Sequence, residues 1–495
     1  MMGKSSSGVM EVEKSSWVVE VDDEVHKLTE ILEAEEKDWE KPCIYKLPPS
    51  VTELNKNNAY KPRVISFGPY HHDDPKLQRL EPHKHRALLR FLKSTGKSAR
   101  HCVEMVRAVA EDLMDAYDSL DTKWRQDPEG FVKMMIRDGC FMLEVLLLES
   151  SLPSSSSATQ PPAPPPPAKG DVSSYARNDP IFSEHGKLFV MPYIKRDMLM
   201  LENQLPMLIL TRLLSIKRPQ LVQVDDMVNR LIVGFCGPAN DHHHHDGSQL
   251  GKRKHVLDVY RQALLSVEGD RDTRVVPTTS VGFCPKGKRR WPWSKDSNKL
   301  DHNILPSATE LHETGISIQQ SHSRGIITDI DFRCGVLYLP QIVVDDLTEF
   351  VFLNLIAFER FHVGLKNEVT SYVALMDDLI DNASDVKLLR SRNIEVVESA
   401  YGSDKAVAKL FNSLGKDISI DNNSSLMDVR RRAIRYSERP WNKWRGNLFQ
   451  YYFTSPWSII SLVAASLLFG LTIIQTLFTI KQYYQPQSPP PLPSP

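Results

Sequence analysis

The sequence predicts a mainly α protein, in which a multi-helix soluble domain with a few short β-strands is followed by one C-terminal transmembrane helix. Three observations support this prediction. Apolar residues recur at helical spacing in many windows, only short runs alternate as strands do, and residues 457–480 carry no charged side chain. At about 1.5 Å of rise per residue this last segment reaches roughly 36 Å, enough to cross a hydrocarbon core of about 30 Å. A buried core helix would normally be shorter.

The composition excludes several classes of protein. The 495 residues can form one large or two medium domains, and 61 Lys and Arg balance 62 Asp and Glu, so no nucleic-acid partner is expected. The six cysteines include no C-x-x-C pair, which argues against both a zinc framework and a dense disulfide scaffold. The N-terminus lacks the apolar run of a secretory signal. Reduced thiols in a cytosolic domain fit this pattern.

The first half of the chain is predicted to be mostly helical, because apolar residues there follow the period of a helix. Helices are expected at 22–39, 76–93, 100–120 and 131–149. Prolines 42, 48 and 49 predict an extended connector at 40–55. A short strand is predicted at Val64–Phe67, where the Gly68-Pro69 turn would end it, and another at Leu188–Val190.

The second half combines helices with the remaining strands. Pro206 is expected to kink or restart a helix, since proline removes a backbone donor. Ser307 followed by Glu310 is typical of a helix start, and Gly315 is expected to end that helix. An alternating stretch leads into a strand near Cys334–Pro340. Further helices are expected up to Phe361, at Leu365–Ile380 and at Ala406–Leu414.

Low-complexity segments divide the chain. A disordered N-terminus is expected at 1–21, and the helical domain is expected to span 22–445. Within it, 150–175 is a Ser/Pro-rich flexible insertion and 237–300 contains variable basic and His-rich loops. The transmembrane helix at 457–480 is followed by a Pro-rich tail at 481–495.

Two histidine clusters are candidate metal ligands. His71, His72, Asp73 and Asp74 follow one another, but four adjacent side chains cannot all converge on one ion from a single turn. A polar loop is therefore the favoured interpretation. His242–His245 could also bind a metal weakly, although their Gly- and Asp-rich context is typical of low complexity. No cofactor and no metal site is predicted.

Several polar residues interrupt strongly apolar runs. Asp138 and Glu144 lie in one such run, where ionised groups are costly unless they are paired. Another run contains Glu202, Asn203 and Gln204, which could either hydrogen-bond the backbone of the helix broken at Pro206 or form a ligand site. We favour the first, because a buried broken backbone must find hydrogen-bond partners.

Other polar groups receive structural interpretations. Asn354 is interpreted as a core hydrogen-bonding residue rather than a catalyst. Asp377, Asp378 and Asp381 are interpreted as a solvated helix edge, because paired catalytic carboxylates would need an apolar cleft. The basic clusters 252–254 and 286–290 are similar to nuclear-import patches but equally typical of solvated loops.

Seven short blocks together resemble a plant family. They are I-Y-K-L-P (44–48), F-G-P-Y-H-H (67–72), D-G-C-F-M-L-E (138–144), L-E-N-Q-L-P (201–206), P-S-A-T-E-L (306–311), N-L-I-A-F-E (354–359) and Y-V-A-L-M-D (372–377). In this combination the chain resembles domain-of-unknown-function family 247 of plants. The resemblance implies a helical soluble region, a C-terminal membrane helix and no established enzymatic activity. Because some members act in self-recognition during grass pollination, it also implies a recognition or signalling role.

The expected function is therefore that of a plant single-pass membrane protein, not an enzyme, which recognises or scaffolds an unknown protein partner. Signatures such as G-x-x-x-x-G-K-[ST], H-E-x-x-H and G-x-S-x-G are absent from the sequence. The alternative is an unrecognised membrane-associated enzyme that uses Glu202, Asp138 or the pair His71 and His72. Nuclear regulation through the basic clusters would conflict with a membrane anchor.

The charges flanking the apolar segment predict its orientation. Seven basic residues and one acid, Glu438, lie between 430 and 445, whereas only Lys481 is charged after the segment. By the positive-inside tendency the long N-terminal region is cytosolic and the protein is tail-anchored, with the plasma membrane favoured over endomembranes. The pairs Ser461/Ala465 and Ser466/Gly470, with Gln475, suggest a homo-oligomer formed through the transmembrane helix.

Overall fold

The computed structural model describes residues 25, 41–54, 59–149, 175–237, 250–265, 304–321, 326–392, 394–416, 418, 425–438 and 456–484. The predicted N-terminal disorder, the Ser/Pro insertion up to residue 174, His242–His245 and the 286–290 cluster lie outside these residues, and so does the 22–39 helix apart from Val25. The chain divides into two compact units, one formed by 1–266 with 346–370 and the other by 267–345 with 371–495. Helices predominate and the strands are few and short, which confirms the predicted fold class.

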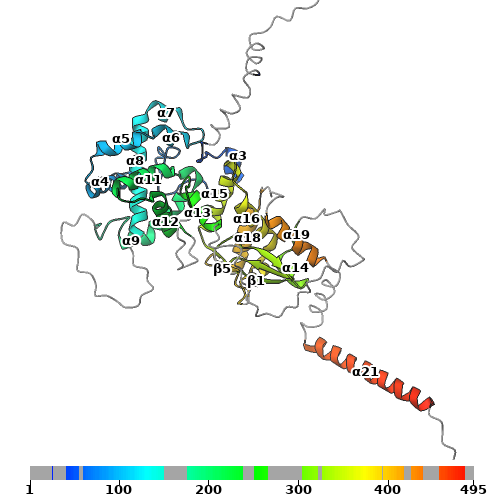
Figure 1. Cartoon of the computed structure of the whole chain (residues 1–495). Helices are drawn as coiled ribbons and strands as arrows, with labels where there is room; N and C mark the ends of the chain where they lie inside the picture. The colour runs from blue at the N-terminus through cyan, green and yellow to red at the C-terminus, as the bar shows by residue number, and fades with distance from the viewer. Residues whose placement is uncertain are drawn as a thin grey trace, which may run out of the picture. The chain divides into compact units, whose positions relative to one another are not determined.

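The first unit is helical (Figure 1). Its elements are α3 (Pro49–Leu54), η1 (Gln78–Leu80), α4 (Glu81–Thr95), α5 (Ala99–Arg107), α6 (Ala110–Asp115), α7 (Thr122–Gln126), α8 (Pro128–Glu149), α9 (Glu184–Phe189), α10 (Met191–Met198), η2 (Leu201–Asn203), α11 (Met207–Lys217), α12 (Val224–Cys236), α13 (Val256–Leu265) and α15 (Thr348–Phe361).

Helix α8 is the centre of the first unit. Pro128 occupies its first turn, and the Asp127 side chain caps it by accepting a hydrogen bond from the backbone N–H of Gly130 at 2.9 Å. Helices α4, α5, α7, α11 and α12 pack against α8, and Figure 1 shows α4, α5 and α11 gathered around it. Its Phe131, Met135 and Phe141 are completely buried. The predicted buried helix at 131–149 is confirmed.

The second unit contains the strands. Its elements are α14 (Ala308–Glu313), β1 (Ser317–Gln320), β2 (Asp331–Arg333), β3 (Val336–Leu339), β4 (Ile342–Val344), α17 (Ala383–Leu389), β5 (Val397–Ser399), α18 (Asp404–Leu414), α19 (Ser425–Ser437) and α21 (Pro456–Tyr484). Helix α16 (Glu368–Leu379) begins in the first unit and continues in the second. The predicted helices near 347–361, 365–380 and 406–414 correspond to α15, α16 and α18.

Two small sheets lie in the second unit. Strand β3 pairs in parallel with β1 and antiparallel with β2, whereas β4 pairs in parallel with β5. Cys334 and Gly335 turn the β2–β3 hairpin with positive φ angles of 51° and 83°, the combination that a tight two-residue turn requires. The capping box predicted from Ser307 and Glu310 is present at the start of α14, so that prediction is confirmed.

Four predictions of local structure are wrong. The connector predicted at 40–55 is not extended throughout, because Pro49–Leu54 forms helix α3, and a proline in the first turn of a helix does not remove a needed donor. Val64–Phe67 forms no strand, because polar side chains rather than a neighbouring strand take its backbone N–H groups. Residues 188 and 189 belong to α9, whose start is capped by the Ser183 side chain, so no strand forms at Leu188–Val190. The helix expected at 100–120 is two helices, α5 and α6, separated at residues 108–109.

Candidate functional site

The polar residues of the sequence motifs meet in the first unit around a segment without regular secondary structure, residues 59–72. Asp197 at the end of α10 is fully buried, and its carboxylate accepts hydrogen bonds from the N–H groups of Arg63, Val64 and Ile65 at 2.7–3.1 Å. Arg196 contributes an ion pair at 3.1 Å. Burial raises the pKa of Asp197, and these donors oppose the rise because they favour the charged form.

Asn203 in η2 continues this support. Its Oδ1 accepts from the N–H of Phe67 at 2.7 Å, while its Nδ2 donates to the carbonyls of Ile65 at 3.1 Å and Asp197 at 2.9 Å. The side chain is completely buried and uses both ends of its amide. One asparagine therefore joins the irregular segment to the turn that precedes α11.

Gln204 and Asn354 do the same for the backbone around Pro206. Gln204 donates to the carbonyls of Met198 and Met200, both at 2.6 Å, and accepts from Leu257 at 3.1 Å. Asn354 of α15 accepts from the N–H of Leu201 at 2.9 Å and donates to Ala59 and Phe350. Pro206 is the residue before α11, so the helix restarts there. The predicted hydrogen-bonding role of these amides is confirmed.

Asp138 on α8 holds Gly68 of the same segment. Its Oδ2 accepts from the Gly68 N–H at 2.9 Å and its Oδ1 lies 2.8 Å from Lys84 Nζ. Lys84 is also completely buried and reaches Glu81 at 2.6 Å and the Ser66 carbonyl at 2.5 Å. Burial raises the pKa of Asp138, against the lowering effect of Lys84. The prediction that Asp138 needs a partner in this apolar run is confirmed.

We call these polar residues the buried network: Asp138, Asp197, Asn203, Gln204, Asn354 and Glu202. Glu202 lies nearest to solvent among them. Its Oε1 accepts from the Leu47 N–H at 2.7 Å, and its Oε2 lies 3.0 Å from His71 Nε2. The two side chains are 9% and 16% exposed. A carboxylate that orients an imidazole is an arrangement found in acid–base sites, but here the carboxylate also fixes the backbone of residue 47.

The remaining members of the His71–Asp74 cluster point to different partners. The His72 ring packs edge-on against Trp124, Asp73 pairs with Lys123, and Asp74 accepts from the N–H of Lys76. Within the described part of the chain no three His, Cys, Asp or Glu side chains are grouped so that they could hold a metal ion. The structure thus does not bring this cluster together.

His255 is another buried polar residue, and the sequence did not reveal its role. It is completely buried, its Nδ1 accepts from the N–H of Asp258 at 3.2 Å, and its Nε2 lies 3.0 Å from the Cys43 carbonyl, to which it donates. Burial lowers the pKa of His255 to about 4. A single histidine in a polar stretch, K-R-K-H, gives no signal of this position.

Glu359 and Arg261 were also missed. Glu359 closes the N-L-I-A-F-E block, and it accepts from Arg261 Nε at 2.8 Å, from the N–H groups of Val369 and Thr370, and from the Thr370 hydroxyl. Arg261 also donates to the Lys366 carbonyl at 2.7 Å. The pair thereby holds the loop between α15 and α16. Its members lie 98 positions apart, so spacing could not have paired them.

One acidic residue in the second unit requires a correction. Asp378 is not part of a solvated edge: it forms an ion pair with Arg430 of α19 and accepts from the N–H of Leu305 at 3.3 Å. Burial raises the pKa of Asp378, and Arg430 lowers it. Asp381 is exposed as expected, and Asp377 is half-buried. Asp378 is shielded from solvent because Arg430 places α19 over this part of α16.

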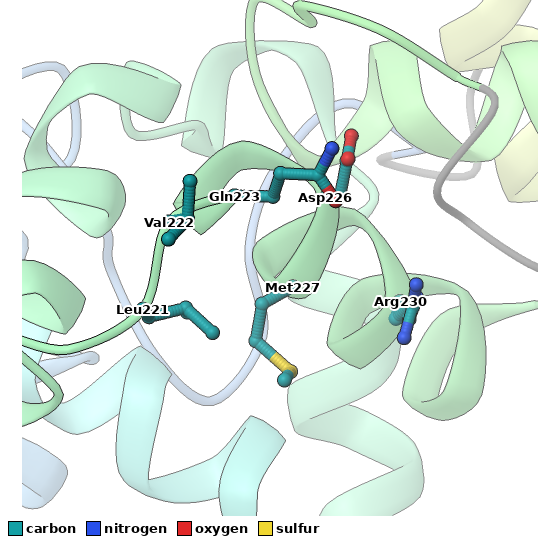
Figure 2. A pocket seen from close by; sticks show the side chains of 6 residues that line it. All are labelled: Leu221, Val222, Gln223, Asp226, Met227 and Arg230. Carbon is teal, nitrogen blue, oxygen red and sulfur yellow. The ribbon is translucent and has the colours of Figure 1, made fainter.

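A shallow hollow of about 250 Å³ lies at the start of α12 in the first unit. Figure 2 shows Leu221, Val222 and Met227 facing it, with Gln223, Asp226 and Arg230 around its rim. Val222 is 95% exposed. None of the network residues lines this hollow, so the motif polar groups and the open apolar surface are separate features of the unit.

Helix α21 is the described candidate for a membrane span. Within it Val463–Tyr484 is long and apolar enough to cross a bilayer, and none of it is buried in the structure. The segment predicted at 457–480 overlaps this stretch and lies wholly within α21.

A helical protein whose motif polar groups bind its own backbone, with one apolar C-terminal helix, is the class that these features define. The chain matches the DUF247 family, described as plant protein of unknown function, over residues 44–471 and belongs to it. It is 29% identical over 463 residues to the UPF0481 protein At3g47200 of Arabidopsis thaliana, covering 91% of this chain and 90% of that protein. The putative UPF0481 protein At3g02645 of Arabidopsis thaliana is 23% identical over 561 residues, covering 96% of each. No solved structure matches the chain.

Proposed function

We propose that this plant protein is a tail-anchored, single-pass membrane protein that recognises or scaffolds another protein from the cytosolic side. The observation that carries the proposal is α21, an apolar helix that no described part of the chain covers. An uncovered helix of this length and composition is costly in water and stable in a bilayer. The excess of basic residues before it favours a cytosolic soluble region.

The buried network supports recognition over catalysis. Asp138, Asp197, Asn203 and Gln204 use their side chains to satisfy backbone groups or a buried lysine, which leaves them committed to the fold. Glu202 and His71 are the pair with the most resemblance to acid–base machinery, and the alternative function, a membrane-associated enzyme, would depend on them.

The α12 hollow is the surface that we assign to partner recognition. It exposes Val222 and contains the half-buried Leu221 and Met227, beside the charged side chains of Asp226 and Arg230. Apolar side chains open to solvent with a polar rim are the usual composition of a protein interface. Its size suits one or two side chains of a partner.

Proximity labelling by the full-length protein in its native tissue tests this function. We expect a reproducible partner set that a Val222→Asp substitution depletes several-fold, since a charge would have to be desolvated at the interface. Val363→Asp is the matched control, because Val363 is also strongly exposed, at 82%, but does not line the hollow. No reproducible partner, or equal loss with both variants, would contradict the recognition function.

The transmembrane helix is also proposed to self-associate. At about 100° per residue, Gln475 lies within about 40° of Ser461 around α21 but about 140° from Gly470. The Ser461 hydroxyl donates to the Trp457 carbonyl of its own helix at 2.9 Å. Gln475 is thus the amide available for a second copy, on the side marked by Ser461 and Ala465.

A further inference from the structure

The arginines of α19 divide into two groups. Arg430 and Arg432 are committed within the second unit: Arg430 pairs with Asp378, and Arg432 pairs with Asp331 at 3.1 Å and Asp428 at 3.0 Å. They hold α19 against α16 and β2.

Arg431 and Arg435 form the second group. They are one helical turn apart, so they share a face of α19, and neither forms an ion pair or hydrogen bond with any described residue. Arg435 is exposed and Arg431 half-buried. Asp428 on the same side is already bound to Arg432, and Glu438 follows the helix. Two guanidinium groups are therefore available on the surface of the unit.

Along the sequence, this face lies near the apolar helix. Residues 438–455 separate α19 from α21, and these 18 residues span at most about 65 Å even when fully extended. They add Arg439, Lys443 and Arg445 and one acid, Glu438. From 425 to 455 there are seven basic residues against two acids, Asp428 and Glu438, so the charge next to the membrane helix is positive.

We propose that Arg431 and Arg435 bind the anionic phospholipid headgroups of the cytosolic leaflet and so hold the second unit against the bilayer. The inference rests on the proposed anchoring by α21. Guanidinium groups match phosphate and carboxylate oxygens in charge and geometry, and the cytosolic leaflet is negatively charged. Attraction worth about 1 kcal/mol for each near-surface arginine corresponds to about a fivefold change in the docking equilibrium.

The test places the full-length protein in nanodiscs. Cys334, exposed at the β2–β3 turn beside α19, carries a fluorophore. The other described cysteines are buried, and Cys284, which lies outside the described residues, is replaced by serine so that it cannot be labelled. Quenching by a headgroup-labelled lipid then reports how close the unit lies to the bilayer. We expect stronger quenching in discs of phosphatidylcholine with phosphatidylserine than in phosphatidylcholine alone, and we expect salt to remove the difference.

The variant Arg431→Gln/Arg435→Gln should reduce the docking equilibrium in phosphatidylserine discs by about 25-fold, two factors of about five. Lys405→Gln/Lys409→Gln is the matched control, because these exposed lysines have the same spacing on α18, and it should leave quenching unchanged. Quenching that is insensitive to lipid charge, or equal effects of both variants, would overturn the lipid inference. Failure of the protein to enter the discs would instead contradict the proposed anchor.

Discussion

At the scale of single residues, the F-G-P-Y-H-H block owes its glycine to a backbone constraint. Gly68 has a φ of +72°, and a Cβ there would lie 2.7 Å from the Tyr117 hydroxyl and 2.9 Å from the Gln204 carbonyl. Its N–H is held by Asp138. The position therefore excludes a side chain both by its conformation and by its surroundings.

Gly68→Ala should lower the free energy of unfolding by about 2–4 kcal/mol, the sum of a left-handed alanine and an overpacked contact. Gly96→Ala is the control: Gly96 also has a positive φ, of +62°, but a Cβ there would meet nothing within 4 Å. It should cost only about 1 kcal/mol. Urea denaturation of the full-length protein in detergent measures both, and equal losses would contradict the packing explanation.

His255 gives a pH dependence. Its pKa is about 4 in the folded protein against an ordinary 6.5, so between these values the unfolded chain binds a proton that the folded protein does not. The contribution of neutral His255 to the free energy of unfolding is complete above pH 6.5. It decreases as the pH falls towards 4, and about 2 kcal/mol has been lost at pH 5. Protonation would remove the acceptor that holds the Asp258 N–H.

The comparison of stability against pH for the native protein and His255→Asn measures this contribution. The two proteins must be compared because burial raises the pKa values of Asp138 and Asp197, and these two groups make the folded protein more stable as the pH falls, opposite to His255. We expect the acid-induced loss between pH 6.5 and 4 to be smaller in His255→Asn and unchanged in His85→Asn, where the histidine is exposed. Parallel curves for all three proteins would refute the assignment.

At the scale of elements, substitutions on the two sides of α21 show which of its small-residue pairs forms the contact between copies. If Gln475 forms the contact between copies, Gln475→Leu and Ser461→Leu should weaken dimerisation in a bilayer. The expected loss for the amide is about fivefold, or ~1 kcal/mol. Gly470→Leu, on the opposite side, should have little effect. Energy transfer between labelled full-length copies in vesicles measures the equilibrium; a larger loss from Gly470→Leu would assign the contact to the other face.

Helices and their ends were more predictable than extended segments. The period of apolar residues found α8, α15, α16 and α18, and local chemistry found the capping box at Ser307 and the restart at Pro206, because these signals lie within one turn of the helix. Val64–Phe67 was misassigned because its hydrogen-bond partners, Asp197 and Asn203, lie more than 130 residues away. The role of the E-N-Q run could be inferred from its chemistry, whereas its partners could not.

At the scale of the whole molecule, the proposed topology makes a covalent prediction. Asn382 belongs to an N-A-S sequon and is exposed at the start of α17, where its side chain caps the helix. In the cytosol it should carry no glycan, while an acceptor sequon appended after Pro495 should be glycosylated in microsomes. The same appended sequence with Asn replaced by Gln is the control. An endoglycosidase-sensitive shift that depends on Asn382 would reverse the proposed orientation.

The dependence of residues 59–72 on distant partners has a consequence during synthesis. The segment leaves the ribosome early, yet Asp197 and Asn203 follow more than 130 residues later, and Asn354, which binds the Ala59 carbonyl, later still. At about 5–20 residues per second this delay is roughly 7–30 seconds for the first partners. The nascent chain must therefore keep Ile65 and Phe67, fully buried in the finished protein, in contact with water or a chaperone until then.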